Sequence, residues 1–105
     1  MGVMNVIALS NLRNFWENAA YQDSEQPLKA WLAETLKATW SQPADIKAPY
    51  GNASIIGKNR VVFNIKGNDY RLIVGVAYKM QWIYVKFVGT HKQYDQVDAE
   101  TVEQF

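Results

Sequence analysis

Two side chains that can transfer protons, His91 and Tyr94, stand three residues apart in the segment GTHKQYD, residues 89–95. They follow directly on a run of strand-forming residues that ends at Val88. Histidine changes its charge near neutral pH and can act as a general acid or base. A lone histidine after a strand is nevertheless more often structural, and a tyrosine there often packs and uses its hydroxyl as a cap. Both interpretations stay open at this point.

Basic residues are concentrated in the part of the chain that leads to this pair. Positions 58–92 hold seven lysines and arginines and one acidic residue, Asp69, whereas residues 95–105 hold four acidic residues and no basic one. The net charge of the whole chain is only +1, so bulk charge does not indicate nucleic-acid binding. The separation of a basic region from an acidic tail does indicate a possible electrostatic footprint.

The composition excludes several kinds of chemistry. The chain has no cysteine and one histidine, which rules out thiol nucleophiles and disulfides and argues against a histidine- or cysteine-based metal site. We therefore expect no metal and no cofactor. No apolar run approaches the ~20 residues that span a bilayer, and the N-terminal residues lack the features of a signal peptide. We expect a cytoplasmic protein without membrane contact.

The first half of the chain has helical periodicity. With 49% apolar residues in a chain of 105, we expect one domain, residues 1–105, with one packed core. Residues 4–8 are typical of a short strand, Ser10 can cap a first helix, and Asp23 or Ser24 can begin a second that ends at Pro43. The predicted apolar faces are Leu12, Phe15, Trp16 and Ala19 in the first helix and Leu28, Trp31, Leu32, Leu36 and Trp40 in the second.

The second half changes to the two-residue period of strands. Residues 42–58 contain two prolines and two glycines and are predicted to be irregular. Strands are expected over residues 59–66, 70–78 and 82–88, joined by short turns, which indicates an antiparallel meander. The order β-α-α-β-β-β predicts an α+β fold in which the two helices cover one face of a small antiparallel sheet.

Alternation along these strands predicts which side chains share the other, uncovered face. The predicted core side chains are Val61, Phe63, Ile65, Tyr70, Leu72, Val74, Val76, Ile83, Val85 and Phe87. The predicted uncovered face holds Asn64, Lys66, Arg71, Trp82, Tyr84 and Lys86, with Gly75 and Ala77 as a shallow floor. A bulge in one strand would exchange the two faces beyond it.

Cations and aromatic rings on one surface suit a phosphodiester. Cations bind the phosphate and stabilise the additional charge of its transition state, and aromatic rings stack on unpaired RNA bases. A histidine beside them can move the proton when a ribose 2′-OH attacks the phosphorus, which yields a 2′,3′-cyclic phosphate and a 5′-hydroxyl end. Arg60 belongs to the predicted substrate-binding residues, although it can also serve as an edge-strand charge that blocks pairing between sheets.

Two longer motifs resemble those of the HigB family of bacterial toxins. They are F-N-I-K-G-N-x-Y-R-L, residues 63–72, and F-V-G-T-H-x-x-Y-D, residues 87–95. The upstream segments LSNLRNFWE and QPLKAW…TWSQPADIKA, the latter within residues 26–48, are similar to the same family's N-terminal half. The resemblance covers most of the chain in the same order.

This resemblance implies a RelE-like fold and the activity of a type II toxin–antitoxin module. Toxins of this kind cleave mRNA, typically in the ribosomal A site, without metal, and are neutralised by a HigA-type helix-turn-helix antitoxin, often in a heterotetramer. The motifs assign Lys66, Arg71, His91 and Tyr94 as catalytic. Arg71 and Lys66 would bind the scissile phosphate, His91 would be the general acid or base, and Tyr94 would orient the nucleotide or share the proton transfer.

The substrate-binding residues predicted from the motifs and the uncovered face are Arg60, Asn64, Asn68, Tyr84 and Lys86. Lys86 stands where the family pattern often has arginine, and lysine keeps the charge but loses the bidentate fork. Two other functions remain open. One is a non-catalytic RNA- or ribosome-binding module on the same fold, and the other is a structural or interaction domain whose basic face is only solvated.

Overall fold

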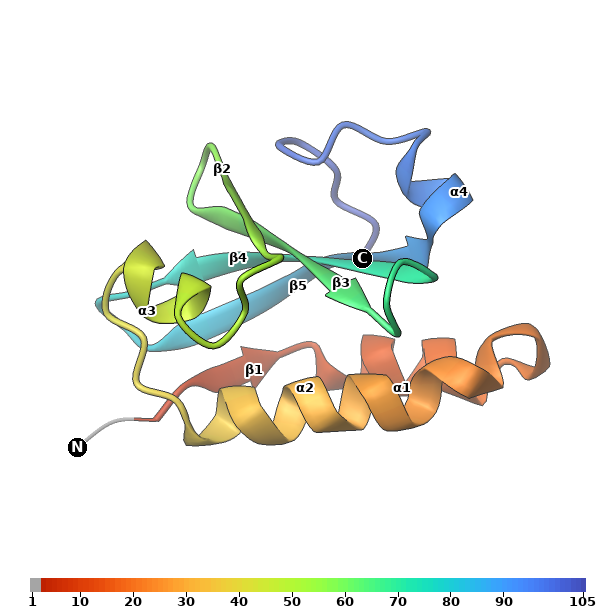
Figure 1. Cartoon of the computed structure of the whole chain (residues 1–105), viewed down its shortest axis with the longest axis horizontal. Coiled ribbons are helices and arrows are strands. Elements are labelled where there is room, and N and C mark those ends of the chain that lie inside the picture. The colour runs from red at the N-terminus through yellow and green to blue at the C-terminus, as the bar shows by residue number, and fades with distance from the viewer. Residues whose placement is uncertain (1–2) are drawn as a thin grey trace.

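The computed structural model describes residues 3–105 and contains a five-stranded sheet (Figure 1). The spatial order is β1-β5-β4-β3-β2. β1 pairs parallel to β5, and the other neighbours are antiparallel. The strands are β1 (Asn5–Ile7), β2 (Ser54–Ile56), β3 (Arg60–Ile65), β4 (Tyr70–Ala77) and β5 (Trp82–Thr90). The predicted meander is confirmed as β3, β4 and β5, and the first predicted strand is β1.

Two helices, α1 (Leu9–Glu17) and α2 (Glu25–Lys37), lie on one side of the sheet (Figure 1). They are joined by a 3₁₀ segment, η1 (Ala19–Ser24). The α+β prediction is therefore confirmed. The shorter helices are α3 (Pro43–Lys47) and α4 (His91–Tyr94). Within residues 3–105 no helix is long and apolar enough to cross a membrane.

The helix boundaries differ from those predicted. α1 begins at Leu9 after Ala8, which has a left-handed backbone, so Ser10 lies inside the helix and makes no cap. α2 ends at Lys37, and Pro43 instead begins α3. Proline is well suited to a first helical position because its missing N–H would have no partner there.

The segment 42–58, predicted to be irregular, contains α3 and the edge strand β2. Ile46 of α3 is fully buried, so a single apolar anchor stabilises a helix too short to show a periodic pattern. β2 pairs with β3 from Ser54 opposite Val62 to Ile56 opposite Arg60. Beyond Val62 the pairing of β3 with β2 ends.

The core between helices and sheet contains the predicted apolar side chains of the strands with one exception, Phe87. Ile73 of β4 pairs with Phe87 and Val74 pairs with Val85, so Lys86 is an additional residue in β5. Such a bulge turns the following residues to the opposite face. Phe87 therefore packs with Val62 and Ile73 on the other side of the sheet. On the predicted helix faces, Ala19 and Leu36 are exposed, so their assignment to the core is wrong.

The side of the sheet away from α1 and α2 is not uncovered, because the C-terminal segment 95–105 crosses it (Figure 1). Val97, Ala99 and Val102 of this segment pack against the small apolar cluster around Phe87. Arg60 lies beneath the segment with 6% of its surface exposed. Its interpretation as an edge-strand charge is wrong, because β3 is flanked by β2 and β4.

Candidate active site

A tight turn in the first recognised motif, residues 63–72, lies beside a short helix in the second, residues 87–95. Residues 66–69 join β3 to β4, and Tyr70 pairs with Thr90 at the end of β5. The backbone N–H of His91 donates to the Asp69 carbonyl at 3.0 Å. Thr90 and Gln93 form a reciprocal cap at the start of α4, which fixes the direction in which the chain leaves the sheet. The K-G-N turn and the T-H-x-x-Y helix are therefore neighbours.

Arg71 and Tyr94 form the centre of this cluster. The guanidinium carbon of Arg71 lies 5.6 Å from the centroid of the Tyr94 ring. One guanidinium nitrogen donates to the Asn68 carbonyl at 3.1 Å, and the other lies 3.5 Å from the Asn68 side-chain oxygen. A cation held over an aromatic face is attracted by its quadrupole, so Arg71, Tyr94 and Asn68 stabilise one another.

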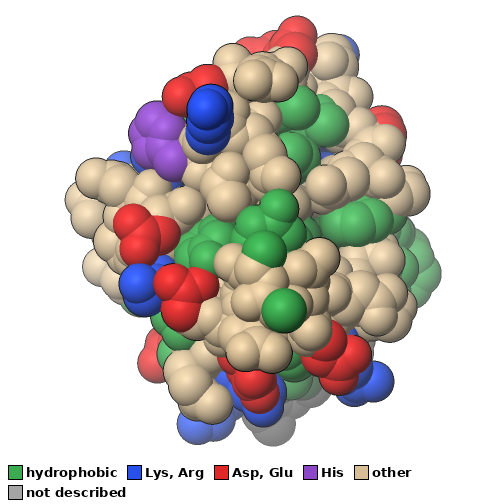
Figure 2. Space-filling model, turned by 90° about the vertical axis from the view of Figure 1, so that its right-hand side faces the viewer, with side chains coloured by type: hydrophobic (Ala, Val, Ile, Leu, Met, Phe, Trp, Pro, Cys, Tyr) green, Lys and Arg blue, Asp and Glu red, His purple; other side chains and the backbone are tan. Residues whose placement is uncertain are grey.

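His91 is half-exposed and begins α4, the short helix that ends at Tyr94. Its Nδ1 lies 3.2 Å from the Asp95 carboxylate, one turn further along α4. Such a contact engages one ring nitrogen, Nδ1, and leaves the other, Nε2, for a different partner. Figure 2 shows the histidine at the surface of a face on which acidic and basic side chains are interleaved.

Lys66 lies in the same turn but faces two carboxylates. Its ammonium is 3.0 Å from Asp69 and 3.2 Å from Asp23, and the hydrogen bonds to these two groups raise its pKa. Asp23 also accepts a hydrogen bond from the Tyr70 hydroxyl. This bond and the one from Lys66 lower the pKa of Asp23, and burial together with the Asp23 bond raises the pKa of Tyr70 to about 12.

A second group of predicted residues lies elsewhere, beneath and beside the C-terminal segment. The Glu103 carboxylate accepts hydrogen bonds from Arg60 and, at 3.0 Å, from Lys86. The bond from Lys86 is the main cause of the lowered pKa of Glu103. Arg60 also donates to the carbonyls of Ala99 and Val102. The predicted convergence of Lys66, Arg71, Lys86 and Tyr84 on one open surface is therefore wrong.

Asn64 is the direct cross-strand partner of Arg71 in the pairing of β3 with β4. It lines a cavity of about 370 Å³ with Trp31, Glu34 and Tyr50, on the side of β3 that β2 leaves unpaired. Trp31 Nε1 and the Tyr50 hydroxyl are buried there without a hydrogen-bond partner. Burial, and to a smaller extent Glu34, raises the pKa of Tyr50 to about 12.

The four predicted cations differ in whether a carboxylate pairs with them. Lys66, Arg60 and Lys86 each form an ion pair with a carboxylate, and among residues 3–105 Arg71 forms none. Arg71 is thus the cation of the set whose charge is available to a phosphate. Sequence reasoning did not assign these partners, although the spacing of Asp95 four residues after His91 is itself a helical contact pattern. No group of three or more acidic, histidine or cysteine side chains within residues 3–105 is placed to hold a metal ion.

Two helices on one side of a small sheet, with a basic and aromatic site at the end of β5, are the features of the RelE-like toxins. The HigB_toxin family model, the RelE-like toxic component of a toxin-antitoxin system, matches residues 24–97. Because the match covers more than half of the chain, the protein belongs to this family. The resemblance seen in the two motifs is confirmed.

Individual relatives agree with this assignment. The chain is 34% identical over 95 residues to the mRNA interferase toxin HigB of Escherichia coli (strain K12), with 88% of each protein covered. The proteins named mRNA interferase HigB in Escherichia coli O157:H7 and Shigella flexneri match with the same identity and coverage.

Proposed function

We propose that this toxin is an endoribonuclease that inhibits translation by cleaving mRNA on the ribosome. The observation that carries the proposal is the contact of the unpaired Arg71 guanidinium with the ring of Tyr94, which ends the short helix α4 that His91 begins. Relatives named mRNA interferase, aligned over 88% of this chain, support the reaction.

The proposed reaction needs no group beyond the RNA and the side chains of the site. The ribose 2′-oxygen forms a bond to the adjacent phosphorus while a general base removes its proton, and the bond from phosphorus to the 5′-oxygen breaks. The leaving 5′-oxygen takes a proton from a general acid. The products are a 2′,3′-cyclic phosphate and a 5′-hydroxyl end, and the oxidation state of no atom changes.

The geometry supports a role for each residue of the cluster. Arg71 would bind the scissile phosphate and stabilise the charge that develops on it. His91, held by Asp95 through Nδ1, would transfer a proton through its other nitrogen. Tyr94 would orient the nucleotide or share the proton transfer. Lys66 would contribute a second cation once a phosphate displaces Asp23 or Asp69 from it.

The proposed substrate contacts differ in their distance from this centre. Asn68 hydrogen-bonds Arg71 and would set its position at the phosphate. Tyr84 and Lys86 would contact RNA away from the scissile bond, whereas Asn64, the cross-strand partner of Arg71, would contact it close to that bond. Arg60 would act through the C-terminal segment to which it is bonded.

We also propose the biological setting that the family implies. Residues 1–105 would form one domain that works in the cytoplasm, and its partner would be a HigA-type helix-turn-helix antitoxin, with which it would form a heterotetramer. Size measurements on the co-expressed pair test the last point: a mass of two toxins and two antitoxins is expected, and a 1:1 complex would contradict it.

The function is tested by inducing the protein in a bacterium and mapping mRNA 5′ ends before and after induction. We expect growth arrest with new ends inside coding regions and in phase with codons, and we expect His91→Gln to abolish them. Arrest with intact mRNA would indicate instead a non-catalytic RNA- or ribosome-binding module. If induction produced no growth arrest and no new 5′ ends, the proposal would be contradicted.

A further inference from the structure

Two aromatic side chains of β5 remain open at the end of the sheet opposite to His91. Trp82 and Tyr84 are half-buried, on the side away from α1 and α2. Their ring centroids are 6.1 Å apart with the planes at 79°. Their neighbours across β4 are Ala77 and Gly75, so small residues leave both rings accessible from that strand.

A lysine completes this group, which we call the aromatic strip: Trp82, Tyr84 and Lys86. The Lys86 ammonium lies 5.6 Å from the centroid of the Tyr84 ring. Its aliphatic stem lies over Gly75, where an added Cβ would approach Lys86 Cε to 3.4 Å. The lysine stem thus packs closely on the backbone of Gly75, beside the tyrosine.

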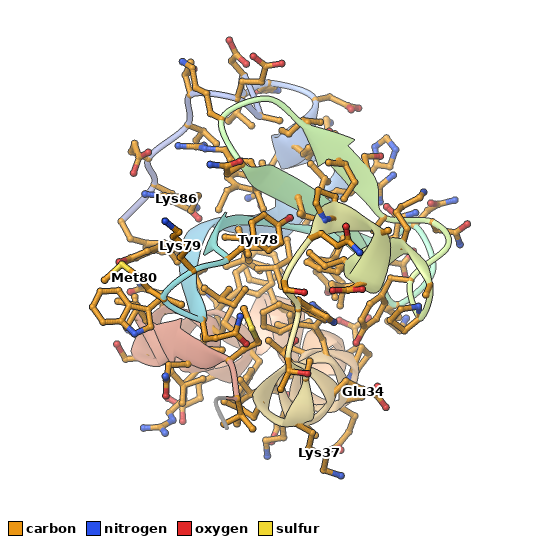
Figure 3. All side chains as sticks on the ribbon, turned by 90° about the vertical axis from the view of Figure 1, so that its left-hand side faces the viewer. Glu34, Lys37, Tyr78, Lys79, Met80 and Lys86 are labelled. Atoms are coloured by element: carbon orange, nitrogen blue, oxygen red, sulfur yellow. The ribbon has the colours of Figure 1, made fainter. Side chains whose placement is uncertain are left out.

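Two lysines and one carboxylate lie at the aromatic strip: Lys86 within it, Lys79 in the adjoining turn, and Glu103. The single carboxylate of Glu103 is shared by Lys86 and Arg60. Lys79 and Met80 in the turn between β4 and β5 are exposed on the same side of the molecule as Lys86 (Figure 3). Because lysines outnumber carboxylates here, an anionic partner is favoured over a cationic one.

The strip is separate from the cluster of Arg71, Tyr94 and His91. Arg71 and Gly75 lie on the same face of β4, four residues apart, which is roughly 13 Å at about 3.3 Å per residue. The apolar cluster that the C-terminal segment covers, with Ile73 and Phe87 at its base, lies between them. A single base or phosphate that binds to the aromatic strip therefore cannot also contact the proposed catalytic side chains.

We propose that the aromatic strip binds unpaired bases of single-stranded RNA, with Trp82 and Tyr84 stacking on them, Lys79 facing the phosphates, and Lys86 joining it once a phosphate displaces Glu103. Every base has a π-face, so rings of this kind bind RNA with little sequence preference, and cations beside them follow the backbone. The inference rests on the proposed function and adds to it a second RNA contact, distant from the bond that is cut.

The aromatic strip contains its own reporter. Trp16, Trp31 and Trp40 are 7%, 3% and 5% exposed, and Trp82 is the tryptophan that is only half-buried. A single-stranded oligonucleotide with 2′-O-methyl riboses cannot undergo 2′-OH attack, so it measures binding without cleavage. We expect this probe to quench tryptophan emission in the wild-type protein, and the quenching to disappear in Trp82→Leu.

Affinity for the same probe, followed by anisotropy of a labelled oligonucleotide, tests the stacking. We expect Tyr84→Leu and Trp82→Leu each to weaken binding about tenfold, because leucine keeps apolar volume but cannot stack. Met80→Leu changes an exposed apolar residue of the adjoining turn and is the matched control, expected to bind like wild type. Circular dichroism and thermal melting verify that each variant is folded.

The outcomes separate the strip from the catalytic proposal. If both leucine variants bind the oligonucleotide as tightly as wild type, the aromatic strip is not an RNA site. If they bind weakly while His91→Gln still cleaves mRNA, the strip stands and the assignment of His91 fails. If only Arg71→Ala weakens binding, the strip is wrong and the RNA contact lies at the Arg71 cluster.

Discussion

The Arg71 guanidinium lies over the ring of Tyr94, 5.6 Å from its centroid, and joins a residue of β4 to a residue of α4. The contact ties the orientation of the tyrosine to the position of the cation. Among residues 3–105 no carboxylate forms an ion pair with Arg71, in contrast to Lys66, Arg60 and Lys86. The charge of Arg71 is therefore the one available for a phosphate.

We predict that Arg71→Ala lowers the rate of mRNA cleavage by about 100- to 1000-fold, the usual cost of removing one group that stabilises transition-state charge. Arg71→Lys keeps the charge but loses the planar fork, so a loss on the order of tenfold is expected. Single-turnover cleavage measures both. Lys58→Ala removes an exposed cation from the β2–β3 turn and is the control. Equal rates for Arg71→Ala and Lys58→Ala would refute the role of Arg71.

Asp95→Asn is predicted to reduce cleavage about tenfold without changing the melting temperature. Its carboxylate, 3.2 Å from Nδ1 of His91, orients the imidazole, and the exposed contact contributes little to stability. A double-mutant cycle gives the decisive comparison. In a His91→Gln background Asp95→Asn should have no further effect, whereas an undiminished additional loss would show that Asp95 acts independently of the histidine.

Acid is predicted to release the C-terminal segment from the sheet before the whole protein unfolds. The pKa of Glu103 is lowered, chiefly by Lys86. Its ion pairs therefore stabilise the fold above pH 4.5, the ordinary value of a glutamate, and this contribution disappears as pH falls through the lowered pKa. Gln104 is bonded to the backbone of Lys86 and Val88.

Amide hydrogen exchange at Gln104 and Val88 measures this release. Exchange should accelerate below pH 4.5 relative to core amides such as that of Leu72, after correction for the intrinsic pH dependence. Glu103→Gln should show the faster exchange already at neutral pH. Protection that is independent of pH and unchanged in the variant would mean that the apolar contacts of Val97 and Val102 alone hold the segment.

Gly89→Ala is predicted to destabilise the protein by about 1–3 kcal/mol, the usual cost of overpacking, and to lower cleavage. A Cβ at Gly89 would lie 2.7 Å from Phe87 Cζ and 2.8 Å from Gln93 Oε1. Relief of these clashes would displace Gln93, which caps α4, and with it His91 and Tyr94. At Gly51 a Cβ meets nothing within 4 Å, so Gly51→Ala is the matched control. Chemical denaturation of both variants gives the comparison.

The three longer strands β3, β4 and β5, the two long helices and their layering could be predicted because each of these elements has a sustained hydrophobic period. The segment after α2 shows the limit of the hydrophobic pattern, because both α3 and β2 within it were predicted to be irregular. α3 spans five residues, and a single buried side chain, Ile46, stabilises it. No periodic signal exists in so short a segment.

The arrangement of the site could be predicted only where the motifs keep residues close in the chain or in register. Arg71 and Tyr94 come together because β4 is paired with β5, which leads directly into α4, and His91 lies in the same helix. Lys86 and Phe87 do not fit the alternation, because the bulge at Lys86 has no signature in the residue pattern. The contact of Glu103 with Arg60 joins residues 43 positions apart, and local pattern carries no information on such a pair.

The central claim is that the cluster of Arg71, His91 and Tyr94 cleaves mRNA by attack of the 2′-OH. The most direct test is to incubate purified toxin with mRNA on programmed ribosomes, and with the free mRNA, and to determine the chemistry of the new ends. Wild type should produce 2′,3′-cyclic phosphate and 5′-hydroxyl ends on ribosome-bound mRNA, and Arg71→Ala and His91→Gln should leave the mRNA intact. Ends that carry a 5′-phosphate, or equal cleavage by both variants and wild type, would contradict the claim.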